Sequence, residues 1–201
     1  MHLRAPAIVC ASRPHGETGV IVRLMTADHG LVAGYVAGGR GRQLRPVLIP
    51  GNLVAAELTA RPGAGMPSAR LELAVSRGPW LTEPLPAAAI SWATVLTAAA
   101  LPERQPYPAL YQALSGLLDA ICAAPSARGW AIALLAYEAL LLRELGFGEP
   151  VARPEADNWA ALLHAFDRLG AAIARYPLAE RRADVMAGRS LLRERLGRIE
   201  D

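Results

Sequence analysis

The sequence contains no lysine, so all 21 of its basic side chains are arginines. Without lysine the chain has no phosphate-loop lysine, no lysine Schiff base and no β3-lysine of the kinase type. It has two cysteines, Cys10 and Cys122, which are too few for a four-thiolate zinc site. We expect both to behave as small buried apolar groups rather than as a disulfide. These shortages exclude several classes of enzyme and metal protein.

Long hydrophobic runs and catalytic spacings are missing as well. The most apolar stretch, residues 86–101, is shorter than a bilayer span and consists mostly of small side chains. The first ten residues lack a signal-peptide pattern, so we expect a cytoplasmic protein without a membrane partner. His15 and Glu17 could share a strand face as an acid–base pair, but no third orienting group is apparent, and a solvated barrel rim is favoured. The sequence predicts no enzyme, no metal and no cofactor.

Hydrophobic periodicity divides the chain in two. Up to about Ser76 apolar residues alternate with polar ones, which is typical of strands. Five strands are predicted, at residues 5–12, 19–26, 31–38, 52–61 and 69–76. Asp28-His29-Gly30 is predicted to form a hairpin turn in which Gly30 adopts a positive φ. Five short strands with a long third connection favour an OB-type Greek-key barrel.

After three prolines at positions 79, 84 and 86 the period becomes 3.6, which is typical of helices. The sequence therefore predicts an α+β chain of two domains, a barrel at 1–79 and an all-α bundle at 80–201. A helix begins near Asp157 or Asn158, either of which is a suitable N-cap. The last helix spans about 179–198, with a possible break at Gly188.

One carboxylate lies in the most apolar predicted helix. Glu138 needs a partner if it is buried, and Arg128 and Arg143 are the nearest candidates in the sequence. A structural ion pair is favoured over a role in binding a partner.

Charge is unevenly distributed along the chain. Residues 1–78 hold nine arginines against four acids, whereas residues 79–201 hold twelve against fourteen. Such an asymmetry indicates a polyanion-binding region. We expect six arginines to line one groove and neutralise phosphates: Arg13, Arg23, Arg40, Arg42, Arg45 and Arg61. The alternative is a solvated loop whose arginines only maintain solubility.

Aromatic residues are scarce in the predicted barrel, where Tyr35 is the single one among residues 1–79. Proteins that bind single strands without sequence preference generally stack bases on aromatic rings. His15, His29 and arginine planes replace such rings only in part. The composition therefore favours backbone binding that tolerates both single and double strands and weakens steeply with salt.

The N-terminal segment "AIVCASRPHGETGVIVRLMTADHGLVAGYVAGGRGR", followed by "LIPGN", resembles the RecO family of bacterial DNA-repair mediators. The shared features are an Arg-x-x-Gly-Glu turn at Arg13, a Thr-x-x-His-Gly hairpin at Thr26 and a basic loop before Leu48-x-Pro-Gly. Later segments, "YPALYQALSGLLDAI" and "YEALLLRELGFG", are similar to the helices that follow the family's barrel. The resemblance covers roughly residues 5–148.

The resemblance implies a function. RecO proteins bind single- and double-stranded DNA, anneal complementary strands and work with RecR, in some cases with RecF. They help to load RecA onto DNA coated by single-strand-binding protein, whose acidic C-terminal tail is a further expected partner. The family's basic positions correspond to Arg13, Arg40, Arg42 and Arg45, whereas Arg23 and Arg61 depend on the strand assignment alone. A bacterial, nucleoid-associated location follows.

One departure from the family concerns zinc. Many members carry a four-cysteine zinc module after the "LGF" helix end, but here Phe147 is followed by "GEPVARPEADNW". The resemblance therefore implies a member without the metal. Two other functions remain open, namely a protein-interaction adaptor built on the bundle and an RNA-binding OB protein.

Overall fold

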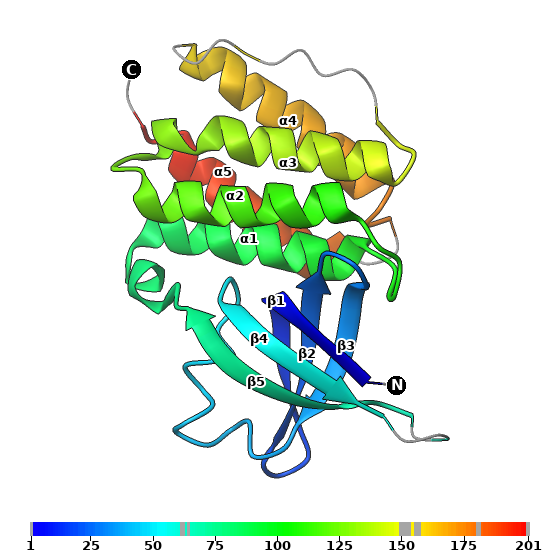
Figure 1. The fold of residues 1–201 in the computed structure, drawn as a ribbon. Helices are drawn as coiled ribbons and strands as arrows, with labels where there is room; N and C mark the ends of the chain where they lie inside the picture. The colour runs from blue at the N-terminus through cyan, green and yellow to red at the C-terminus, as the bar shows by residue number, and fades with distance from the viewer. Residues whose placement is uncertain are drawn as a thin grey trace.

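The computed structural model describes residues 2–60, 63, 65–148, 154, 158–179 and 182–199 (Figure 1). Its strands are β1 (His2–His15), β2 (Gly19–Thr26), β3 (Gly30–Val36), β4 (Leu53–Thr59) and β5 (Ser68–Val75). Its helices are α1 (Pro84–Ala100), α2 (Pro108–Ala123), α3 (Ala131–Glu144), α4 (Trp159–Arg175) and α5 (Arg182–Leu196), with short 3₁₀ turns η1 (Gly78–Thr82) and η2 (Ala127–Gly129). The predicted α+β class is confirmed.

The strands close into a barrel in the order β1-β2-β3-β5-β4. Neighbouring strands are antiparallel except β3 and β5, which meet in parallel where Tyr35 lies beside Ser68. The predicted five-stranded OB-type barrel is thus confirmed. β1 is longer than predicted because it pairs with β4 from His2 and with β2 as far as His15. A bulge between Val9 and Ala11 lets the strand bend from one partner to the other.

The hairpin between β2 and β3 turns at Gly30, whose φ is 65° as predicted. This position requires glycine for a second reason. A Cβ atom there would lie 1.9 Å from the backbone oxygen of Gln105, in the α1–α2 connection. The Thr26 hydroxyl closes the turn by donating to the Gly30 oxygen at 3.0 Å. The turn is therefore packed directly against the helical part of the chain.

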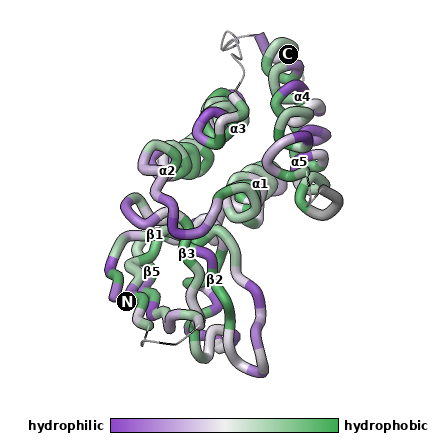
Figure 2. Tube along the Cα trace, turned by 90° about the vertical axis from the view of Figure 1, so that its right-hand side faces the viewer, coloured by the Kyte–Doolittle hydropathy of each residue, from purple (hydrophilic) through white to green (hydrophobic). Residues whose placement is uncertain are grey.

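The barrel contributes to two separate hydrophobic cores. Its interior is filled by side chains such as Val9, Val22, Leu24 and Leu58. A second core unites the helices with residues on the outside of the barrel, namely Ile8, Cys10, Met25 and Leu31. Figures 1 and 2 show the helices gathered over one end of the barrel, with α1 and α2 nearest to the strands. The predicted division after residue 79 falls in η1, between β5 and α1, and stays a prediction.

The two cysteine thiols are free, as expected; Cys10 is fully buried, whereas Cys122 is only partly buried and accepts a hydrogen bond from Arg77 at 3.6 Å. Burial raises the pKa of the Cys10 thiol to about 12. None of the described helices combines the length and the apolarity that a bilayer span requires.

Two expectations about the last helices have different outcomes. α4 begins after Asn158, whose side-chain oxygen accepts a hydrogen bond from the Ala161 amide at 2.9 Å. Asn158 is therefore the N-cap, and Asp157 lies outside the described residues. The predicted break at Gly188 is wrong, because α5 runs through this residue without interruption. A single interior glycine costs only about 1 kcal/mol of helix propensity, which tertiary anchoring outweighs.

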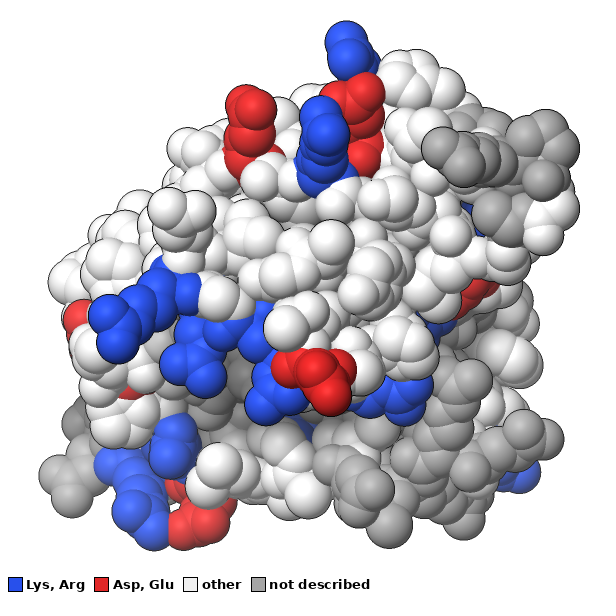
Figure 3. All heavy atoms as spheres, turned by 90° about the horizontal axis from the view of Figure 1, so that it is seen from below, with Lys and Arg blue, Asp and Glu red and all other residues white. Residues whose placement is uncertain are grey.

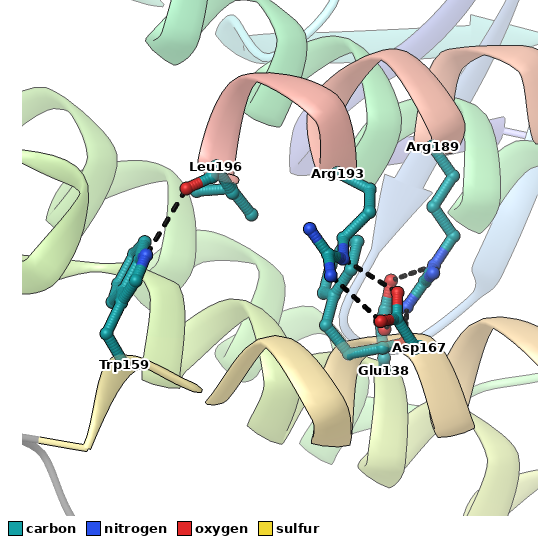
Figure 4. Close-up of polar contacts among 7 residues, drawn as sticks. Glu138, Trp159, Asp167, Arg189, Arg193 and Leu196 are labelled. Carbon is teal, nitrogen blue, oxygen red and sulfur yellow. Dashed lines mark hydrogen bonds and ion pairs between the residues drawn. The ribbon is translucent and has the colours of Figure 1, made fainter. Parts of the chain in front are cut away.

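The partner of Glu138 is neither Arg128 nor Arg143, which corrects the prediction. Glu138 is fully buried, and Arg189 of α5 donates to both of its carboxylate oxygens, at 3.0 and 2.8 Å (Figure 4). Trp92 of α1 adds a hydrogen bond from its indole nitrogen at 2.7 Å. The two nearer arginines are engaged elsewhere, Arg143 with Glu144 and Arg128 over the Trp159 ring. The carboxylate therefore joins three helices.

Two further contacts hold α5 against α4. Arg193 forms a two-pronged ion pair with Asp167, at 2.7 and 2.9 Å. The Trp159 indole donates to the Leu196 backbone oxygen at 3.2 Å (Figure 4). Together with the Glu138–Arg189 pair, these bonds anchor the C-terminal half of α5, from Arg189 to Leu196.

Candidate nucleic-acid interface

The connection between β3 and β4, residues 37–52, is a folded cap rather than a flexible arm. The amides of Arg45 and Leu48 donate to the oxygens of Gly41 and Leu44, at 3.1 Å each, as in helical turns. Leu48 is buried in the barrel interior. At the end of the connection the Asn52 side chain donates to the Pro46 oxygen at 2.7 Å. The backbone that carries the loop arginines is therefore ordered.

Four of the six predicted arginines gather at the end of the barrel that this loop closes. We call Arg13, Arg40, Arg42 and Arg45 the basic row; all four are exposed. The Arg40 amide donates to the Thr18 backbone oxygen at 3.1 Å, and its guanidinium donates to the Glu17 backbone oxygen at 2.9 Å. These bonds tie the loop to the β1–β2 turn, close to Arg13. Figure 3 shows basic side chains crossing this face, with an acidic side chain among them.

Within the described part of the chain, the charges of the basic row are not paired with acids. Among the described residues, none of its four guanidinium groups forms an ion pair. The outer face of β1 and β4 is different, because Arg4 pairs with Glu57 at 2.9 Å. The hydrogen bond from Arg4 lowers the pKa of the Glu57 carboxyl. Uncompensated positive charge is thus concentrated at the end of the barrel.

The other two predicted arginines do not join the row in the described part of the chain. Arg23 lies on the outside of β2 but points toward the helices, where it donates to the Ala98 oxygen and pairs with Glu103 at 3.3 Å. Only 26% of its side chain is exposed. A phosphate contact through Arg23 would require breaking these bonds. Arg61 lies outside the described residues.

Beside the basic row lies a hollow of about 490 Å³ that the sequence did not reveal. Its walls come from the β1–β2 turn, the outer face of β2 and β3, and the end of the β4–β5 connection. The side chains that shape it are His15, Glu17, Ile21, Tyr35, Met66 and Ser68. In OB barrels these elements form the face that binds oligonucleotides. We call this feature the rim hollow.

Two aromatic rings meet in the rim hollow. The Tyr35 and His15 ring centroids lie 6.1 Å apart and the rings are nearly perpendicular, at 81°. The tip of the Tyr35 ring lies over Gly19, where a Cβ atom would come within 2.3 Å of it. The strand register could have indicated this pair, because His15 faces Gly19 while Tyr35 faces Ile21, two residues along β2. Knowing the register required knowing the fold.

A second concave feature lies between α3 and α4, and we call it the bundle pocket. It measures about 220 Å³ and has an apolar floor that includes Leu142, Leu169 and Ala172. Phe147 and Tyr176 stack in parallel at its edge, with centroids 5.1 Å apart. The exposed Arg168 and Arg175 complete its lining. An apolar floor between two cations suits an acidic segment that carries apolar side chains.

No metal site is formed by the described residues, among which no three His, Cys, Asp or Glu side chains come close enough to hold an ion.

Comparison with known proteins identifies the family. Family models described as "Recombination protein O N terminal" and "Recombination protein O C terminal" match residues 1–74 and 83–153. The chain is 46% identical to DNA repair protein RecO of Rhodospirillum centenum over 71% of its own length and 56% of that protein's.

Two further relatives bear the same name. Identity is 41% to the protein of Phenylobacterium zucineum, over 74% of this chain and 60% of the relative. Identity is 37% to the protein of Caulobacter vibrioides strain NA1000, over 84% of this chain and 69% of the relative. The alignments with the first two relatives thus span less than two thirds of those proteins. The barrel, the helices and these relatives together place the chain in the RecO family of DNA repair proteins.

Proposed function

We propose that the chain is a DNA-binding mediator of recombination and repair that holds the phosphate backbone on its basic row. The observation that supports this most strongly is the concentration of four exposed arginines, unpaired among the described residues, at one end of an OB barrel. Phosphates that these guanidinium groups neutralise release condensed counterions, which favours binding regardless of sequence. Both single- and double-stranded DNA are substrates in this proposal.

Strand annealing follows from the same charges. Two complementary strands repel each other, and arginines that neutralise phosphates on both lower that repulsion. The mechanism requires no catalytic step and no nucleotide hydrolysis. In the cell we propose that the protein acts on the chromosome in the bacterial cytoplasm, with RecR and in some settings RecF. Its product is DNA onto which RecA loads.

We assign the acidic C-terminal tail of single-strand-binding protein to the bundle pocket. Arg168 and Arg175 supply the charge complement, and Leu142, Leu169 and the Phe147–Tyr176 pair supply apolar contact. Substitution of Arg168 and Arg175 by Glu is expected to abolish binding of a tail peptide and to leave the affinity for bare oligonucleotides unchanged. Unchanged peptide affinity in a folded variant would remove this assignment.

The DNA-binding proposal is tested by a salt series on labelled oligonucleotides. The variant Arg40→Ala/Arg42→Ala/Arg45→Ala is expected to bind more weakly and to lower the slope of log K against log salt by about 2 for single strands. Arg4→Ala is the matched control, because it removes an exposed arginine that is already paired with Glu57. If affinity and slope are the same in both variants, the basic row does not bind DNA.

The result also separates the two alternatives. A protein-interaction adaptor would leave DNA binding weak and insensitive to the triple substitution while partner binding persists. An RNA-binding protein would prefer RNA when RNA and DNA of one sequence compete. Annealing of complementary strands, followed with the same variants, tests whether binding leads to the proposed activity.

A further inference from the structure

The rim hollow differs chemically from the basic row beside it. It combines an aromatic pair, His15 and Tyr35, with the apolar side chains of Ile21 and Met66. Its lining also includes an acidic residue, Glu17. A carboxylate repels phosphate, whereas a neutral ring is compatible with it. The hollow is therefore suited to the uncharged part of a nucleic acid rather than to its backbone.

The hollow and the row are adjacent through specific contacts. The Arg40 guanidinium donates to the Glu17 backbone oxygen at 2.9 Å, and its amide donates to the Thr18 backbone oxygen. Because Glu17 and Thr18 line the hollow, this arginine of the basic row lies at the hollow's wall. Arg13 lies opposite Ile21 on the neighbouring strand, and Ile21 lies opposite Tyr35. Facing residues in antiparallel strands present their side chains on one side of the sheet. Arg13 thus lies on the same outer face as the aromatic pair, and Arg40 lies at the wall of the hollow.

From this arrangement we infer that the rim hollow is a stacking site for one unpaired nucleobase of single-stranded DNA, with the neighbouring phosphates on Arg13 and Arg40. The inference rests on the proposed function and extends it, because phosphate contacts alone do not distinguish paired from unpaired DNA. A base in a duplex is stacked between its neighbours and cannot enter the hollow. Base–aromatic stacking tolerates any sequence because every base has a π-face. The hollow therefore confers a preference for single strands.

Gly19 allows the Tyr35 ring to lie where it does. The Tyr35 ring extends from β3 across β2, and the absence of a side chain at Gly19 leaves room for its tip. His15 then meets the ring from the end of β1 at 81°. The tyrosine is held between a glycine and an imidazole before any ligand arrives, which lowers the ordering cost of stacking.

The test compares oligonucleotides of equal length and phosphate number, one with bases and one built of abasic sites. For the natural protein we expect the base-bearing strand to bind about fivefold to tenfold more tightly at one fixed salt concentration. Tyr35→Leu is expected to remove most of this difference, Tyr35→Phe to keep it, and His15→Ala to reduce it. None of the three should change the affinity for a blunt duplex by more than about twofold.

Each outcome has a defined meaning. Equal binding of both strands by the natural protein overturns the stacking site, and that comparison needs no variant. Base preference that survives Tyr35→Leu in a folded protein overturns it as well. If the triple arginine substitution weakens binding to both strands, the proposed function stands whichever way the stacking test falls. If the natural protein binds neither strand nor the duplex, the proposed function itself fails.

Discussion

Arg77 donates from Nη2 to Oδ1 of Asp119 at 2.7 Å, across the junction between the barrel and the helices. Its Nε donates to the Gly51 backbone oxygen at 3.3 Å, at the end of the loop that carries three of the four arginines of the basic row. Its own amide is held by the Asn52 side chain at 2.7 Å. One buried arginine of the charge-rich N-terminal half thus joins the loop, the segment after β5 and α2.

Arg77→Ala is expected to lower the free energy of unfolding by about 1–3 kcal/mol, because the Gly51 oxygen loses a buried donor. Asp119→Asn is the control and should cost less, since the amide oxygen at this position still accepts a hydrogen bond from the buried Arg77 guanidinium and the bond to the Gly51 oxygen is kept. Urea unfolding measures both. Equal losses in the two variants would show that the charge of Asp119, not the bond to the loop, carries the effect.

Glu138→Ala is expected to destabilise the fold by about 3–5 kcal/mol, because it leaves the guanidinium of Arg189 buried without its carboxylate. The double variant Glu138→Met/Arg189→Met should recover much of that loss, since apolar side chains of similar volume avoid the desolvation of both charges. Thermal or urea unfolding provides the comparison. A single variant as stable as the natural protein would contradict the assignment of this pair as the centre of the bundle.

The pair between Asp167 and Arg193 makes part of the stability depend on pH. The hydrogen bond from Arg193 lowers the pKa of the Asp167 carboxyl below its ordinary value. A lowered folded-state pKa stabilises the fold above the unfolded-state pKa of about 3.9, and this contribution is lost as the pH falls through the folded-state pKa. Asp167→Asn should therefore be less stable than the natural protein at pH 6. The difference should shrink as the pH is lowered to about 3 and below, and a constant difference would contradict this linkage.

Gly30→Ala is expected to cost more stability than Gly38→Ala, although both glycines have a φ of 65°. The backbone strain of an alanine is shared by the two sites, at roughly 1–2 kcal/mol. At Gly30 the new Cβ also collides with the Gln105 oxygen, whereas nothing lies within 4 Å of it at Gly38. The difference between the two variants in urea unfolding isolates the collision. Equal losses would mean that the α1–α2 connection moves away at little cost.

Much of the architecture followed from local patterns. Alternation over β2 and β5, the turn at Gly30 and the change of period after the three prolines depend on neighbours within a few residues, so the strands and helices could be predicted. The cap at Asn158 is local for the same reason. The family resemblance likewise rested on ordered motifs, and the matched relatives confirm it.

Contacts between distant segments were decided only by the tertiary structure. Glu138 pairs with Arg189 on α5 and not with either arginine nearby in the sequence, because helix packing brings the Arg189 guanidinium into the core. Arg23 lies on the same outward strand face as Arg13, but its guanidinium donates to the Ala98 backbone oxygen of α1, which covers part of the barrel. The meeting of His15 with Tyr35 required the register of three strands. Periodicity reports which face a side chain occupies, but the partner on that face depends on how the whole chain packs.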